Sequence, residues 1–250
     1  RSPVKRDWVS EAPVALEYNG LTYAVMMASP HDLEDFVAGF ALTEGLAARF
    51  ADIADIAVSR VENGWIARAR LSGPGAMRLA ERARARVSES SCGLCGIENL
   101  DALAHPLPKV SAHAPIAAPA IFAALAALPE FQPLNAQTGA AHAAAMVSPA
   151  GAILCAREDV GRHNALDKLA GAIARAGQGM ATGFVLSTAR CSYEIVEKAV
   201  KAGAATLVTI SLPTDLAAAR ARDAGLSLWA LARSDSVLLV NDAASGAISA

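Results

Sequence analysis

The sequence lacks several features that mark specialised classes of protein. It has four cysteines in 250 residues, too few for the disulfide framework of a secreted fold. Its formal net charge is only −2 and its basic residues are scattered, so nothing indicates nucleic acid or an anionic membrane surface as a partner. No charged segment followed by an apolar one opens the chain, and a cytoplasmic location is therefore the expectation.

Charged residues are absent from two long stretches, 110–128 and 136–156, which raises the question of a membrane span. Pro115, Pro119 and Pro149 interrupt these stretches. Alanine, which dominates both, contributes too little transfer free energy to hold them in lipid. Both stretches are expected to lie in the core of a soluble protein.

The first third of the chain predicts an α+β lobe. Two Asn-Gly dipeptides, at residues 19–20 and 63–64, each lie between alternating apolar segments and predict β-hairpins. Between them, the segment SPHDLEDFVAGFALTEGL predicts an amphipathic helix that is capped by Ser29 and ends before Gly45.

The second part of the chain predicts a different organisation. From residue 152 onward, short apolar runs alternate with helical segments that end near glycines 177, 203 and 225. This order indicates βαβ units and a largely parallel sheet. The predicted fold class is thus α/β (α+β overall), with an N-terminal α+β lobe over residues 1–110 that ends in a Cys-x-x-Cys loop, and an α/β lobe over residues 111–250.

The segment SSCGLCG places Cys92 and Cys95 between glycines in a Cys-x-x-Cys spacing. A structural zinc site would have to recruit Cys155, Cys191 or distant histidines. A thioredoxin-like disulfide would need the pair at the start of a helix that follows a strand, which is not the context here. An unreactive loop is another alternative, but a glycine-flanked pair best fits a thiolate that accepts a group and passes it on.

The motif REDVGRHNALDK predicts an anion site at the start of a helix. Asn164 is expected to cap this helix, with Asp167 three residues later. Arg162, His163 and Lys168 are expected around its first turn, where the helix dipole and added cations favour phosphate. An ordinary capped helix with a solvated charged face is the alternative.

Two further polar segments follow predicted strands. The segment STARCSYEIVEKA follows a predicted strand and places polar side chains at its carboxyl end, the edge at which open α/β sheets bind ligands: Ser187, Thr188, Arg190, Ser192 and Glu194. The segment LARSDS, at 231–236, is a similar bend after the last crossover. The alternative for the first segment is a plain strand-to-helix turn capped by Ser192.

A zinc deaminase is disfavoured. In TGAAHAAAM, Ala144 stands two residues after His142, where such an enzyme would have its glutamate, and no Pro-Cys-x-x-Cys helix follows. No metal site is predicted.

Taken together, the helical segment, the cysteine pair and the motifs TGAAHAAA, REDVGRHNALDKLAG, RCSYEIVEKAVKAG and ISLPTDLAAARARDAGLSLWALAR resemble the formate dehydrogenase accessory sulfurtransferase family. The resemblance implies a homodimer that carries persulfide sulfur from a cysteine desulfurase to the molybdenum bis(molybdopterin guanine dinucleotide) cofactor, so that formate dehydrogenase becomes active. The cofactor would be a bound substrate, with no intrinsic metal. The resemblance also implies that the second lobe has three layers similar to the cytidine deaminase fold, without its zinc.

The same resemblance implies the roles of individual residues. Cys92 would carry the persulfide and Cys95 would assist or relay it, whereas the thiols of Cys155 and Cys191 are assigned structural roles. Ala189 departs from the family, in which many members have glycine. The rival hypotheses are a cofactor-binding chaperone without catalysis and a zinc hydrolase or deaminase. The residues implied in cofactor binding are Arg162, His163, Asn164, Arg190, Cys191, Ser192, Leu231, Ala232, Arg233, Ser234, Asp235 and Ser236.

Overall fold

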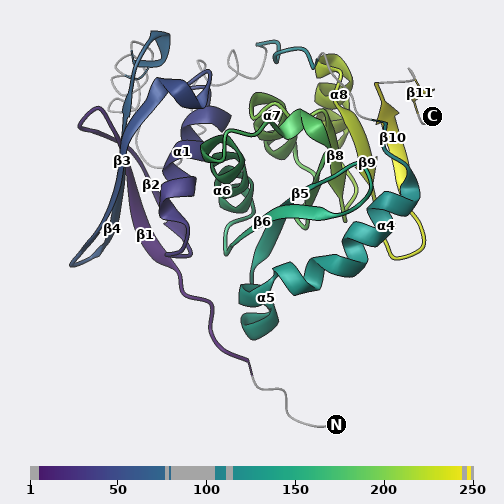
Figure 1. Ribbon diagram of the computed structural model, residues 1–250, viewed down its shortest axis with the longest axis horizontal. Coiled ribbons are helices and arrows are strands. Elements are labelled where there is room, and N and C mark those ends of the chain that lie inside the picture. The colour runs from purple at the N-terminus through teal and green to yellow at the C-terminus, as the bar shows by residue number, and fades with distance from the viewer. Residues whose placement is uncertain (1–5, 77–78, 80–104, 111–114, 244–246, 249–250) are drawn as a thin grey trace.

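A computed structural model describes residues 6–76, 79, 105–110, 115–243 and 247–248 (Figure 1). The described chain forms two sheets with helices packed between and around them. The predicted thiol pair, Cys92 and Cys95, lies outside the described residues.

The first lobe is a four-stranded sheet, ordered β2-β1-β4-β3, with helix α1 (Leu33–Thr43) packed against it (Figure 1). Both predicted hairpins are confirmed, because β1 pairs antiparallel with β2 and β3 with β4. The elements of this lobe are β1 (Ala12–Tyr18), β2 (Leu21–Ala28), α1 (Leu33–Thr43), the 3-10 turn η1 (Phe50–Asp52), β3 (Ile53–Val61) and β4 (Gly64–Leu71).

The predicted start of α1 is wrong by several residues. The helix begins at Leu33, and Asp32 occupies the N-cap position. Ser29 is instead buried against the second lobe, where its N–H donates to the Asp159 carboxylate (3.0 Å) and its Oγ accepts from the N–H of Val160 (3.1 Å). The Ser29 hydroxyl thus accepts a hydrogen bond from a distant segment of the chain and does not cap α1.

The second lobe is a seven-stranded sheet, ordered β11-β10-β9-β8-β7-β5-β6. Only β7, β8 and β9 are parallel, so the predicted largely parallel sheet is wrong for the remaining strands. The reason is that β5 and β6 form a hairpin, while β10 turns back along β9. The predicted helix ends are confirmed, since Gly177, Gly203 and Gly225 adopt positive φ where α6, α7 and α8 end.

The elements of the second lobe are α4 (Ala118–Ala127), η2 (Leu128–Phe131), α5 (Pro133–Thr138), β5 (His142–Val147), β6 (Ile153–Asp159), α6 (Arg162–Arg175), η3 (Met180–Thr182), β7 (Phe184–Ser187), α7 (Tyr193–Lys201), β8 (Thr206–Thr209), α8 (Asp215–Ala224), β9 (Ser227–Ala230), β10 (Leu238–Asp242) and β11 (Ala247–Ile248). Residues 105–110 lie against α8, where the N–H of Val110 donates to the carbonyl of Ala224 (2.8 Å). The predicted lobe boundary between residues 110 and 111 stays a prediction.

This second lobe has three layers. On one face of the sheet, Ala144 and Met146 of β5 pack into a core with α6, α7 and α8. On the other face, Ala145 and Val147 pack with α4. The uncharged stretch around β5 is thus core, as predicted, and no described helix is both long and apolar enough to cross a bilayer. The likeness to the cytidine deaminase fold stays a prediction.

The lobes meet where α1 crosses α6, and two glycines permit that crossing. A Cβ added to Gly39 would lie 1.7 Å from the carbonyl oxygen of Asp167, and one added to Gly171 would lie 1.9 Å from that of Asp35. Both distances are far inside van der Waals contact. The two helices therefore touch backbone to backbone, and only glycine fits at either position.

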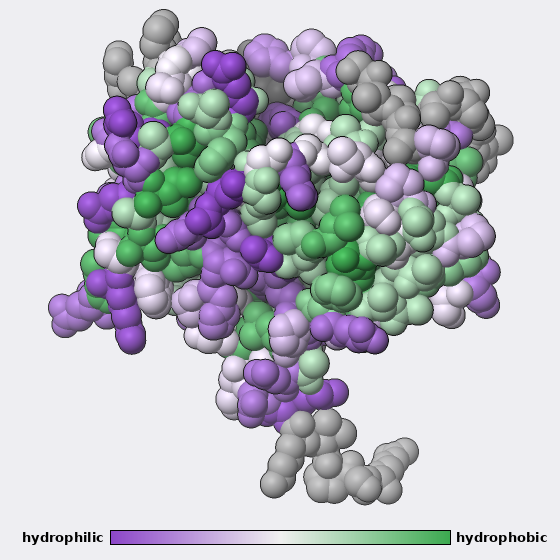
Figure 2. Space-filling model, in the orientation of Figure 1, coloured by the Kyte–Doolittle hydropathy of each residue, from purple (hydrophilic) through white to green (hydrophobic). Residues whose placement is uncertain are grey.

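Buried charges line the same boundary. Asp35 of α1 receives the guanidinium of Arg157 (2.8 Å) and also that of Arg175. On α6, Asp167 binds Lys198 (3.0 Å) and accepts from the hydroxyl of Thr43 (2.6 Å). On the face shown in Figure 2, hydrophilic residues gather in a band between the two lobes. The second lobe thus supplies cations to a carboxylate of the first, and the first lobe supplies a hydroxyl donor to a carboxylate of the second.

Candidate functional site

The segments singled out in the sequence converge at one edge of the seven-stranded sheet. The parallel strands β7, β8 and β9 all end there. Because β5 is antiparallel to β7, its first residue, His142, lies at the same edge, and His142 pairs with Asp159 at the end of β6. The loop into α6, the loop into α7 and the bend after β9 therefore meet, as the carboxyl-edge rule predicts.

Hydrogen bonds join the loops after β7, β8 and β9 into one surface. The N–H of Cys191 donates to Oγ of Ser211 (3.0 Å), and that hydroxyl donates to the carbonyl of Ala189 (3.1 Å). The N–H of Ala232 donates to the carbonyl of Thr209 (3.1 Å). Ser211 was not among the predicted residues, although its position after a predicted strand could have indicated it.

His163 connects the starts of α6 and α7. Its Nε2 lies 3.1 Å from a carboxylate oxygen of Glu194, an ion pair when the imidazole is protonated. Burial lowers the pKa of His163, while the nearby Glu194 carboxylate acts in the opposite direction and Arg162 lowers it further. The imidazole is therefore mostly neutral at pH 7, and its contact with Glu194 strengthens on acidification.

Two buried polar atoms at this edge, Nε of Arg162 and Oγ of Ser192, have no hydrogen-bond partner among the described residues. Ser192 occupies the predicted N-cap position of α7, yet its side chain makes no capping bond. Since nearly all buried polar atoms in proteins are hydrogen-bonded, this pair of atoms fits a ligand with acceptor oxygens. The first turns of α6 and α7 add partial positive charge.

His142 is a site residue that the sequence argument did not assign. Burial lowers the pKa of its imidazole, and the nearby guanidinium groups of Arg162 and Arg190 lower it further, whereas Asp159 opposes them. Recognition of TGAAHAAA as a strand that runs antiparallel to β7 would have placed His142 here.

The predictions that Asn164 caps α6 and that Lys168 adds a cation for phosphate at its first turn are wrong. The N-cap of α6 is Gly161, and the amide of Asn164 donates to Asp159 (3.0 Å) and to the carbonyl of Met27 (2.9 Å). Lys168 is fully buried, with Nζ 2.6 Å from the Asp159 carboxylate. Burial of Asp159 requires a counter-charge, and Lys168 supplies it. Lys168 is thus unavailable to a phosphate, and contact between Asn164 and a cofactor stays a prediction.

The bend at Leu231–Ser236 presents exposed polar side chains at the same edge. Leu231 adopts φ 50°, a strained conformation for a residue with a branched side chain. The guanidinium of Arg233 donates to the carbonyls of Ile210 and Ala232, which fixes the start of the bend. Arg233, Ser234, Asp235 and Ser236 are all exposed, so their side chains can reach a ligand.

The two described cysteines are poor nucleophiles. Burial raises the pKa of Cys191 to about 11 and also raises that of Cys155. These raised pKa values agree with the structural roles that the sequence analysis assigned to the two thiols. Within the described part of the chain, no three His, Cys, Asp or Glu residues form a group that could hold a metal ion.

Comparison with known proteins decides the family. A family model described as the FdhD/NarQ family matches residues 9–244. The chain belongs to the FdhD/NarQ family. Among curated members, it is 43% identical over 223 residues to "Sulfur carrier protein FdhD" of Bordetella petrii, a match that covers 89% of this chain and 80% of that protein. It is 45% identical over 233 residues to the protein of the same name from Chromobacterium violaceum, with 91% and 86% covered.

A solved structure supports the fold of this family. The chain superimposes on the crystal structure of a candidate formate dehydrogenase accessory protein from Desulfotalea psychrophila with a TM-score of 0.68. The superposition covers 93% of this chain and 86% of the other, at 24% identity. At that identity, the likeness concerns the fold alone.

Proposed function

We propose that this FdhD/NarQ family member carries sulfur for the maturation of formate dehydrogenase. It would receive persulfide sulfur from a cysteine desulfurase and pass it to the molybdenum bis(molybdopterin guanine dinucleotide) cofactor. Membership of the family and the name that the relatives share support the sulfur-carrier role. A homodimer and a cytoplasmic location stay predictions.

Cys92 is the proposed persulfide carrier. Its thiolate attacks the outer sulfur of the desulfurase persulfide, the donor's S–S bond breaks, and the donor cysteine leaves as a thiolate. One sulfane sulfur atom moves: Cys92 is oxidised from a thiolate to a persulfide while the donor persulfide is reduced to a thiolate, so no external oxidant is needed. Cys95 assists this step or relays the sulfur. The raised pKa values of Cys155 and Cys191 support the assignment, because they disfavour the two described cysteines as nucleophiles.

The cofactor would bind as a substrate at the edge formed by the starts of α6 and α7 and the Leu231–Ser236 bend. The observation that carries this proposal is the pair of buried polar atoms, Nε of Arg162 and Oγ of Ser192, that have no hydrogen-bond partner among the described residues. Phosphate oxygens of a guanine dinucleotide supply acceptors for the guanidinium and the hydroxyl. The partial charges of the helix starts act in the same direction.

The carrier role predicts sulfur on Cys92. After incubation with a cysteine desulfurase and cysteine, the intact mass of the protein is expected to increase by one sulfur atom that reductant removes. Cys92→Ser should abolish this gain and the activation of formate dehydrogenase, whereas Cys155→Ser should leave both unchanged. Sulfur retained on Cys92→Ser would identify another nucleophile. No gain on the unmodified protein, with desulfurase binding demonstrated, would favour the cofactor-binding chaperone.

The cofactor site predicts binding of guanosine diphosphate through Arg162. Loss of a charge-assisted hydrogen bond to phosphate is worth roughly 1.5–3 kcal/mol, so Arg162→Gln should weaken binding by about tenfold or more. Calorimetric titration measures this, with Arg49→Gln as the control, since the Arg49 side chain is 77% exposed in the other lobe. Equal affinities of the two variants would contradict the proposed site without affecting the sulfur-carrier role.

A further inference from the structure

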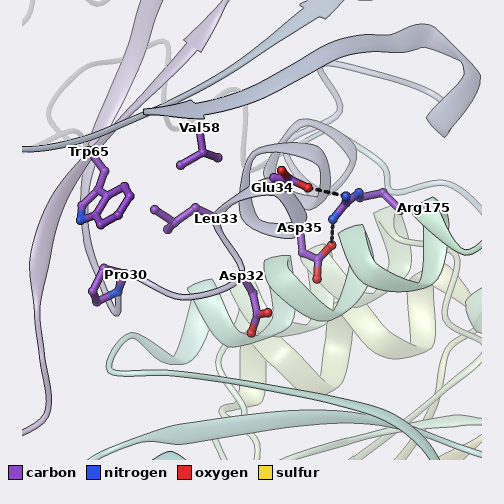
Figure 3. A pocket seen from close by; sticks show the side chains of 8 residues that line it. All are labelled: Pro30, Asp32, Leu33, Glu34, Asp35, Val58, Trp65 and Arg175. Carbon is purple, nitrogen blue, oxygen red and sulfur yellow. Dashed lines mark hydrogen bonds and ion pairs between the residues drawn. The ribbon is translucent and has the colours of Figure 1, made fainter. Parts of the chain in front are cut away.

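A cavity of about 300 Å³ lies beside the first turn of α1, away from the candidate cofactor site (Figure 3). On β4, Trp65 alternates onto the same face as Ala67 and Ala69, which are buried in the core beneath α1. Trp65 itself is only half-buried and lines the cavity, together with Val58 of β3. The cavity therefore continues the core of the first lobe past the first turn of α1.

The lining of the cavity has two parts of different chemistry, with Trp65 on the left and Arg175 on the right of Figure 3. One part is apolar and consists of Pro30, Leu33, Val58 and Trp65. The other consists of the charged side chains Asp32, Glu34, Asp35 and Arg175. A fitting occupant therefore has an apolar stem that ends in a charged or polar group.

The charge of the lining selects a cation. The three carboxylates of the lining pair with two guanidinium groups, those of Arg175 and of the neighbouring Arg157, which leaves one net negative charge. Arg175 is already shared between Asp35 and Glu34, and Arg157 lies outside the lining, 2.8 Å from Asp35 and 3.6 Å from Asp32. The Asp32 and Glu34 side chains are 44% and 52% exposed, so their carboxylates form an outward-facing acidic rim.

The indole of Trp65 favours a planar cation. Its ring already attracts the guanidinium of Arg60, which lies 6.0 Å from the ring centroid. A guanidinium can stack on an aromatic face and donate in parallel to a carboxylate, which an ammonium cannot do. We propose that this cavity is a docking site for an arginine side chain of a partner protein.

The position of the cavity makes such docking compatible with an occupied cofactor site. Arg162 begins α6 at the cofactor site, and Arg175, the last residue of this 14-residue helix, lines the cavity. A helix of that length spans about 20 Å. A protein partner can therefore hold the chain at one end of α6 while the other end remains accessible. The inference does not depend on the proposed function.

The test is a titration of the whole protein with the peptide acetyl-Ala-Arg-Ala-amide, followed through the indole N–H signal of Trp65, which Trp65→Phe identifies. A saturable shift is expected, with a dissociation constant on the order of 1 mM, as suits a single side chain. The neutral isostere in which citrulline replaces arginine should bind roughly tenfold more weakly, because its charge-assisted hydrogen bonds are lost. A lysine peptide should fall between them.

Matched variants locate the contact. Glu34→Gln should weaken binding of the arginine peptide several-fold, and Glu130→Gln, an exposed carboxylate of the other lobe, should not change it. The proposal is overturned if no saturable shift occurs, if citrulline binds as tightly as arginine, or if the two Glu→Gln variants behave alike. Unfolding curves of both variants confirm that any loss is not a loss of folded protein.

Discussion

Replacement of Lys168 with methionine is expected to lower the free energy of unfolding by about 3–5 kcal/mol, the usual effect of removing one partner of a buried ion pair. Methionine keeps the length and the apolar stem of lysine, so the change removes little besides the charge. Asp159 would remain fully buried without its cation, and the carbonyl of Ser29 would lose the ammonium that donates to it (2.9 Å). Urea unfolding followed by circular dichroism measures the difference.

Lys201→Met is the matched control for this prediction. Lys201 is partly exposed and lies 3.6 Å from Glu197, one helical turn away. Exposed pairs of this kind contribute roughly 0–1 kcal/mol, so this variant should remain close to the unmodified protein. Similar losses of unfolding free energy in the two variants would show that the buried Lys168–Asp159 ion pair stabilises the fold no more than an exposed pair does.

Alanine at Gly39 or Gly171 should destabilise the protein by about 3 kcal/mol or more, the upper range for overpacking. At both positions the added methyl group would meet a backbone carbonyl of the facing helix, which cannot move aside as a side chain can. The helices would have to separate. Because α6 carries Arg162 and His163 at its start, guanosine diphosphate binding should weaken together with stability.

Gly179→Ala separates this effect from the general consequence of replacing glycine. Gly179 has open space around its Cβ position and a negative φ of −112°, so alanine there should be neutral or slightly stabilising. The Gly39→Ala/Gly171→Ala double variant should lose less than the sum of the single variants, since both separate the same pair of helices. Full additivity would argue against a shared contact.

The parts of the fold that local chemistry determines could be predicted from the sequence. Asn-Gly turns place both hairpins of the first lobe, and glycines with positive φ end α6, α7 and α8. The convergence of the α6 start, the α7 start and the Leu231–Ser236 bend also follows from sequence order, because parallel strands end at one edge.

What could not be predicted depends on contacts between distant segments. Ser29 and Asn164 have the composition of helix caps, yet each bonds to a segment about 130 residues away. Lys168 belongs to a charged motif, and only the fold shows that it is buried against Asp159. His142 joined the site unpredicted because its strand is an alanine-rich run without clear periodicity, and the direction of that strand is set by its pairing with β7.

The charged boundary between the lobes limits how the parts of such a protein can be exchanged. Asp35 relies on Arg157 and Arg175 of the other lobe, and Asp167 relies on Thr43. A hybrid that joined the first lobe of one relative to the second lobe of another would inherit acids without their matching partners, unless both parents kept the same set. Neither lobe can therefore be transferred as an independent module without the charged partners that the other lobe supplies.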